Sequence, residues 1–154
     1  MNINNNRFVI YDFETTGRNS NWDQIIQVGA ILVDSRFNEL DRLDIRSSLK
    51  PGLIPEPGAL LVNNTSPDML TKSNFTHYHM INEVLRKFKE WSPAVFMGYN
   101  SIDFDEEFLR KTLFKTLHSP YFTQLNGNKR VDILGMVRSS SIFFPEIFKY
   151  NKNE

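Results

Sequence analysis

The sequence predicts an α/β fold in which a mixed sheet is flanked by helices. Two observations carry this prediction: extended apolar or alternating segments come first along the chain, and amphipathic helical segments follow with one more apolar strand between them. Strands that precede helices and then interleave with them favour a sheet of mixed direction with helices packed on it. A length of 154 residues is typical of one domain. We therefore expect a single domain over residues 1–154.

Three strands are predicted near the start of the chain. Residues 7–14 read R-F-V-I-Y-D-F-E, an aromatic and β-branched run that is typical of a central strand. A second strand is expected at 25–33, and a third at about 41–50, where alternation indicates one face in water. The connection at 34–39 is short enough for a hairpin between them.

Proline and glycine separate these strands from the first helices. The segment 50–67 is rich in proline, and we interpret Pro55-Glu56-Pro57-Gly58 as part of an ordered loop without regular structure. Ser66 followed by Pro67 is typical of a helix start. A longer amphipathic helix is expected at about 79–91.

The rest of the chain predicts one strand and two helices. Residues 94–99 are short and apolar and indicate a buried strand, and a helix is expected at about 104–117. Asp132 is expected to cap a last short helix through about Ser140. The predicted order is β-β-β-α-β-α-α.

Composition limits the classes of function. Eighteen basic and eighteen acidic residues give a formal charge of zero, so any site for nucleic acid must be local. Without cysteine the chain has neither disulfides nor thiolate metal sites. The polar start at 1–6 lacks an apolar signal segment and no run is long enough to span a membrane, so we expect a cytoplasmic protein without a membrane partner.

Asp12 and Glu14 are the first candidate functional residues. Being two apart on a strand, they leave the same face of the sheet. Two carboxylates at the end of an apolar strand repel each other unless a cation neutralises them, and hard oxygen ligands favour Mg²⁺ or Mn²⁺. The alternative is a pair at a strand end that simply faces water.

A second group of acids follows the strand at 94–99. Residues 98–105 read G-Y-N-S-I-D-F-D and lead from a strand end into a helix, where a carboxylate can face the first strand. Acidic residues in a first helical turn are favoured by the helix dipole, which is sufficient to explain Asp103, Glu106 and Glu107.

The two motifs together resemble the DEDD family of 3′ to 5′ exonucleases. Y-D-F-E-T-T-G at 11–17 and G-Y-N-S-I-D-F-D at 98–105 are similar to the first two motifs of that family. The resemblance implies a ribonuclease-H-like fold, and it identifies Asp12, Glu14 and Asp105 as catalytic and metal-binding carboxylates. It also implies hydrolysis with two Mg²⁺ or Mn²⁺ ions in the intact domain.

The resemblance narrows to the bacterial exonuclease I family, which acts on single-stranded DNA. The P-E-P-G-A loop at 55–59 and the R-V-D-I-L-G-M-V-R segment at 130–138 are similar to segments of that family. Single-stranded DNA is therefore the expected partner. The residues expected to contact substrate are Thr15, Thr16, Gly17, Leu61, Val62, Asn100 and Phe104. For Leu61 and Val62 the alternative is that they only anchor a long loop.

The third motif of the family, H-x-x-x-x-D on a late helix, is absent. His77, His79 and His118 precede its expected place and none has an aspartate five positions later, so we expect them to be surface or capping residues. We therefore expect a fold that lacks the final helix, in a fragment with little or no activity. A naturally short, inactive relative is the alternative.

Two other classes of function compete with this reading. A haloacid-dehalogenase-like phosphatase also places acids after a buried strand, but Glu14 in the second acidic position argues against it. A catalytically dead nucleic-acid-binding or scaffold module could keep the same fold, and metal binding through Asp12 would separate it from a nuclease.

Overall fold

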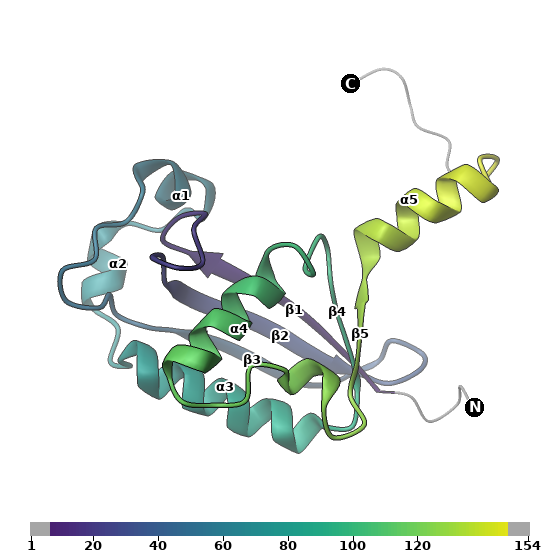
Figure 1. The fold of residues 1–154 in the computed structure, drawn as a ribbon, viewed down its shortest axis with the longest axis horizontal. Coiled ribbons are helices and arrows are strands. Elements are labelled where there is room, and N and C mark those ends of the chain that lie inside the picture. Colours follow the sequence, from purple (N-terminus) through teal and green to yellow (C-terminus); the bar gives the residue numbers. More distant parts are fainter. Residues whose placement is uncertain (1–6, 148–154) are drawn as a thin grey trace.

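The computed structural model describes residues 7–147; the polar start at 1–6 and the polar tail at 148–154 lie outside the described residues. Five strands form one sheet in the order β3-β2-β1-β4-β5 (Figure 1). The central strand β1 (Phe8–Thr15) pairs antiparallel with β2 (Ile25–Val33) and parallel with β4 (Val95–Gly98). The predicted mixed sheet is therefore confirmed.

The outer strands complete the sheet on both sides. On one side β3 (Glu39–Arg46) pairs antiparallel with β2, and on the other β5 (Lys129–Asp132) pairs parallel with β4. β5 was not predicted from the sequence. It is four residues long and begins with two basic residues, so only its pairing with β4 makes it a strand.

The two faces of β1 have different roles. Val9, Tyr11 and Phe13 are buried and belong to the hydrophobic core, which includes residues of α3 and α4. Residues at alternate positions leave the opposite face, where Asp12 is exposed and Glu14 is half-buried. The core thus holds the strand in place while its acidic residues remain outside the core.

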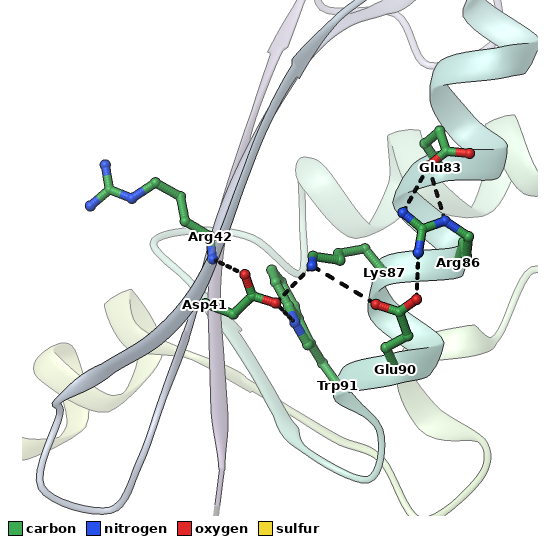
Figure 2. A network of polar contacts seen from close by, with 7 residues as sticks. All are labelled: Asp41, Arg42, Glu83, Arg86, Lys87, Glu90 and Trp91. Carbon is green, nitrogen blue, oxygen red and sulfur yellow. Dashed lines mark hydrogen bonds and ion pairs between the residues drawn. The ribbon is translucent and has the colours of Figure 1, made fainter.

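The helix α3 (His77–Trp91) buries one apolar stripe against the sheet. Thr76 caps it, with its hydroxyl accepting a hydrogen bond from the amide of His79, so the helix begins two residues before the predicted start. Figure 2 shows how its last turns meet β3: Asp41 accepts hydrogen bonds from Trp91 Nε1 at 2.9 Å and from Lys87 Nζ at 2.7 Å. This contact fastens the helix to the edge strand.

The proline-rich segment contains a short helix. The prediction that Pro55–Gly58 has no regular structure was wrong in part, because α1 (Pro57–Val62) begins at Pro57, where a missing amide hydrogen is tolerated. The helix buries none of its residues and lies near the end of β1 (Figure 1). The expected start at Ser66 is confirmed, since its hydroxyl caps α2 (Pro67–Thr71).

Two helices follow β4. α4 (Asp105–Lys115) packs on the core through Phe108, Leu109 and Leu113. α5 (Ile133–Phe143) begins at its predicted cap, where Asp132 accepts a hydrogen bond from the amide of Leu134. α5 buries no residue and projects away from the sheet in Figure 1. Within residues 7–147, no helix follows it and no helix is long and apolar enough to cross a membrane.

Candidate functional site

The strand β1 delivers Asp12 and Glu14 to one face of the sheet. Asp12 lies opposite Gly29 of β2 and Glu14 lies opposite Gln27. Glycine has no side chain, so the neighbouring strand leaves room beside the Asp12 carboxylate. Among the described residues, Asp12 makes no hydrogen bond or ion pair with another side chain.

A tight turn after β4 carries Asp105 back to β1. The turn begins at Gly98, where an added Cβ would lie 2.9 Å from the carbonyl oxygen of Tyr11 and 2.8 Å from Cβ of Ser101. The Asp132 carboxylate holds the turn by accepting hydrogen bonds from the amides of Asn100 and Ile102 at 3.0 and 3.1 Å. Asp105, the first residue of α4, is consequently buried beside β1.

Asp105 is tied to the strand by one backbone bond. Its Oδ1 accepts a hydrogen bond of 2.9 Å from the amide of Phe13, the residue between Asp12 and Glu14. The three candidate carboxyl groups therefore come together from two elements. All three line a single cleft of about 680 Å³.

Glu106 differs from its sequence interpretation as a helix-end charge. It is 1% exposed and accepts hydrogen bonds from the Tyr11 hydroxyl at 2.8 Å and the Thr123 hydroxyl at 2.9 Å. Arg130 of β5 completes the pairing at 3.3 Å. Glu106 thus links β1, β5 and α4 through buried polar contacts. Asp103 is exposed and Glu107 is half-buried, as helix-end charges often are.

The carboxyl groups of the cleft have raised pKa values. Burial, and then the charge of Asp12, raise the pKa of Asp105 to about 7. Partial desolvation also raises the pKa of Asp12. For Glu14, desolvation and the Asp12 charge raise the pKa, while Arg46 opposes them. Burial is the main cause in all three cases and the charge of Asp12 adds to it for Asp105 and Glu14, so a bound cation would favour the charged forms.

The donor set fits a hard divalent cation in its chemistry. Asp12, Glu14 and Asp105 present only carboxylate oxygens, the ligands that Mg²⁺ and Mn²⁺ prefer. Across residues 7–147, no three His, Cys, Asp or Glu side chains already stand close enough to form a metal site. A cation would therefore have to draw the exposed Asp12 and the half-buried Glu14 toward the fixed Asp105.

The predicted substrate residues fall into two groups. Those that line the cleft are Thr15, Gly17, Val62, Asn100 and Phe104. Thr16 and Leu61 do not line it. Thr16 is fully buried, and its hydroxyl donates to Asp23 at 2.9 Å and accepts from the amide of Gln24, so it closes the loop between β1 and β2. Leu61 is 80% exposed on α1.

Several cleft residues were not predicted as site residues. Arg18, Glu56, Asn63 and Tyr99 also line the cleft. Asn63 donates from its side-chain amide to the carbonyl of Thr15 at 2.9 Å, which joins α1 to the end of β1. Glu56 lies in the P-E-P-G-A loop and Tyr99 in the second motif. Both residues could therefore have been predicted as cleft residues from their motifs.

The histidine prediction was wrong for one residue of three. His77, the first residue of α3, is 4% exposed, and neither of its ring nitrogens has a hydrogen-bond partner. His79 is exposed and its ring packs edge-on against Phe75. His118 is half-buried and bonds to Asn82 at 3.1 Å.

The sequence of this chain is similar to those of curated bacterial exonucleases. Exodeoxyribonuclease I of Buchnera aphidicola subsp. Schizaphis graminum is 29% identical over 152 residues, which cover 96% of this chain and 31% of that protein. Exodeoxyribonuclease I of Haemophilus influenzae is 30% identical over 141 residues, covering 90% of this chain and 30% of that protein. The chain thus spans about a third of the length of these curated relatives.

Solved structures agree in fold. A crystal structure of E. coli exonuclease I in complex with a dA16 oligonucleotide has a TM-score of 0.88 and 25% identity, covering 97% of this chain and 32% of that one. A zinc-ion-bound form of the E. coli ExoI–ssDNA complex has a TM-score of 0.89 and 24% identity, with the same coverage. The predicted ribonuclease-H-like fold is confirmed by these matches.

A family model described as Exonuclease matches residues 9–153, which include all three cleft carboxylates. This match covers nearly the whole chain. The chain therefore belongs to the exonuclease family.

Proposed function

We propose that this chain carries the metal-binding carboxylates of a 3′ to 5′ exodeoxyribonuclease that acts on single-stranded DNA. The observation that carries the proposal is the convergence of Asp12, Glu14 and Asp105 on one cleft, without a basic residue paired to any of them among the described residues. Exodeoxyribonuclease I relatives match over most of the chain, which supports DNA as the substrate.

In this proposal Asp12, Glu14 and Asp105 hold Mg²⁺ or Mn²⁺. When bound, such ions supply an activated water and neutralise charge on the phosphate. Asp105 is the rigid member, because Phe13 fixes one of its oxygens and burial prevents it from turning into solvent. Asp12 and Glu14 are the more accessible members, since neither is fully buried.

The walls of the cleft suggest how the end of a strand would be held. Tyr99 is 66% exposed beside the carboxylates and offers a ring on which a base can stack, and Val62 offers an apolar contact from α1. Arg18 brings a positive charge to the same cleft for a phosphate. Thr15, Gly17, Asn100 and Phe104 form the remaining predicted contacts.

Thr16 has a positioning role in this proposal. Its carbonyl accepts a hydrogen bond of 2.7 Å from the amide of Glu56, so the loop before α1 is fastened to the end of β1. Leu61 does not line the cleft and is exposed on α1 next to Val62, so in this proposal it would meet only a longer DNA strand.

We also propose that residues 1–154 form a single exonuclease domain that lacks the third motif of the family. The competing candidate is a nucleic-acid-binding module that has lost catalysis. The raised pKa of Asp105 in a cleft of like charges favours the nuclease, because an inert module has no need to keep three converging carboxyl groups.

The test is trimming of a 5′-labelled single-stranded oligonucleotide with Mg²⁺ or Mn²⁺. The chain is fused to the segment of an exonuclease I relative that carries H-x-x-x-x-D, because no histidine follows His118 here. We expect a ladder of products shortened from the 3′ end, abolished by Asp12→Ala and unchanged by Asp68→Ala, an exposed residue of α2. A chimera that binds the oligonucleotide without shortening it would favour the inert module.

A further inference from the structure

A second cavity lies where the first turn of α3 meets the end of α4 and the segment after β3. Its volume is about 450 Å³, and it shares no lining residue with the carboxylate cleft. Lys50, His77 and Lys115, from three different parts of the chain, all line it. The exonuclease chemistry proposed above makes no use of these residues.

Two lysines give the cavity a positive charge that nothing in the described chain neutralises. Within residues 7–147, neither Lys50 nor Lys115 forms an ion pair with a carboxylate. Lys115 donates to the carbonyls of Ser20 and Asn21 at 3.3 and 2.6 Å, which positions its ammonium group without cancelling its charge. Burial and the charge of Lys115 lower the pKa of Lys50.

His77 is an unpartnered polar side chain in the wall of the same cavity. It is 4% exposed, and both Nδ1 and Nε2 lack a hydrogen-bond partner. Burial first, and then the charges of Lys50 and Lys115, lower its pKa to about 3. Buried polar atoms are nearly always paired in folded proteins, so a buried imidazole with two unpaired nitrogens, close enough to both lysines to feel their charges, is an exception that calls for an explanation.

The start of α3 adds backbone amide donors, which also carry partial positive charge. α3 is 15 residues long, and its dipole places partial positive charge at His77 and Tyr78. The Thr76 hydroxyl serves the amide of His79, which leaves the amides of His77 and Tyr78 without an acceptor inside the helix. A group that accepts hydrogen bonds and carries negative charge would complement every one of these features.

We propose that this cavity binds an oxyanion of the phosphate class between Lys50 and Lys115, at the start of α3 and beside His77. Such an oxyanion would accept hydrogen bonds from both ammonium groups and from the free amides, and its charge would balance the two lysines. The same chemistry is offered by free phosphate and by a phosphate of a nucleic-acid strand that leaves the cleft.

The test measures binding of inorganic phosphate by calorimetry, in EDTA so that no divalent ion occupies the carboxylate cleft. We expect saturable binding to the 154-residue chain, weakened at least tenfold by Lys50→Gln. Lys89→Gln is the matched control, because it removes one exposed lysine from the last turn of α3, at the opposite end of the helix. Lys115→Gln should also weaken binding, and thermal melting reports whether each variant is folded.

A second readout places the anion. The ring nitrogen resonances of His77 should shift as phosphate saturates the chain, whereas those of the exposed His79 should shift much less. A parallel titration with a short single-stranded oligodeoxynucleotide separates the two sources. Binding of phosphate alone assigns the cavity to a free anion, and binding of the oligonucleotide that depends on Lys50 assigns it to the strand. No saturable binding of either probe, or equal binding by Lys50→Gln and Lys89→Gln, would overturn the proposal.

Discussion

The amide of Phe13 donates a hydrogen bond of 2.9 Å to Oδ1 of Asp105, across 92 residues of sequence. Through this bond the central strand fixes the carboxyl group that begins α4, on the strand that also carries Asp12 and Glu14. The bond favours the charged carboxylate, but burial and the nearby Asp12 outweigh it, so the pKa of Asp105 is raised to about 7.

Asp105→Asn should stabilise the protein at neutral and alkaline pH. The pKa of Asp105 in the folded protein, about 7, exceeds its ordinary value of 3.8. The contribution of Asp105 to the free energy of unfolding should therefore be highest below about pH 4, fall as the pH rises, and level off above about pH 7. The variant escapes this loss. We expect urea unfolding at pH 8 to show a gain on the order of 2 to 4 kcal/mol over the native chain, and a much smaller gain at pH 4.5. An equal gain at both pH values would contradict this account.

Manganese binding should depend on pH through the same group. A metal ligand must be deprotonated, so affinity should rise by about tenfold for each pH unit as the pH increases toward the pKa of Asp105, about 7, and level off above it. Asp12→Asn should weaken binding at every pH, while Asp68→Asn, on the surface of α2, should not. Calorimetry between pH 5.5 and about pH 8 measures both effects. Affinity that is flat across this range would exclude Asp105 as a ligand.

Glu106→Ala should destabilise the fold. The Glu106 side chain is 2% exposed and Arg130 is 28% exposed, and the change leaves Arg130 and the hydroxyls of Tyr11 and Thr123 without their acceptor. Breaking a buried pair of this kind costs about 3 kcal/mol. Glu107→Ala, one position further along the same helix, should cost less than about 0.5 kcal/mol. Urea unfolding of the two variants tests the difference. Equal losses of unfolding free energy would show that the hydrogen bonds of Glu106 do not stabilise the fold.

The 154-residue chain by itself should degrade single-stranded DNA very slowly. No histidine follows His118, and general-base assistance is typically worth about 10² to 10⁴ in rate. A gel assay with a 5′-labelled oligonucleotide and Mn²⁺ should therefore show little shortening at enzyme concentrations where the chimera produces a full ladder. Robust shortening by the chain alone that is lost in Asp12→Ala would show that another group supplies the base.

The sequence by itself determined the main strands and the longer helices, and it predicted three candidate carboxylates, Asp12, Glu14 and Asp105, which the structure brings to one cleft. The runs at β1 and β2 are long and apolar, and α3 has a clear buried stripe, so local pattern was sufficient. Asp12 and Glu14 were assigned to one face because side chains alternate along a strand, and the register of β1 against β2 agrees.

Tertiary structure alone decided features that depend on distant partners. β5 is a strand because β4 pairs with it, although its four residues carry little local signal. Glu106 has a structural role because it accepts hydrogen bonds from Tyr11 and Thr123 in the interior. Thr16 stabilises the loop between β1 and β2 because it bonds to Asp23 and Gln24. His77 begins α3 and is buried, while His79, two residues on in the same helix, faces solvent. Burial and long-range pairing set these roles, and neither is encoded in the spacing of nearby residues.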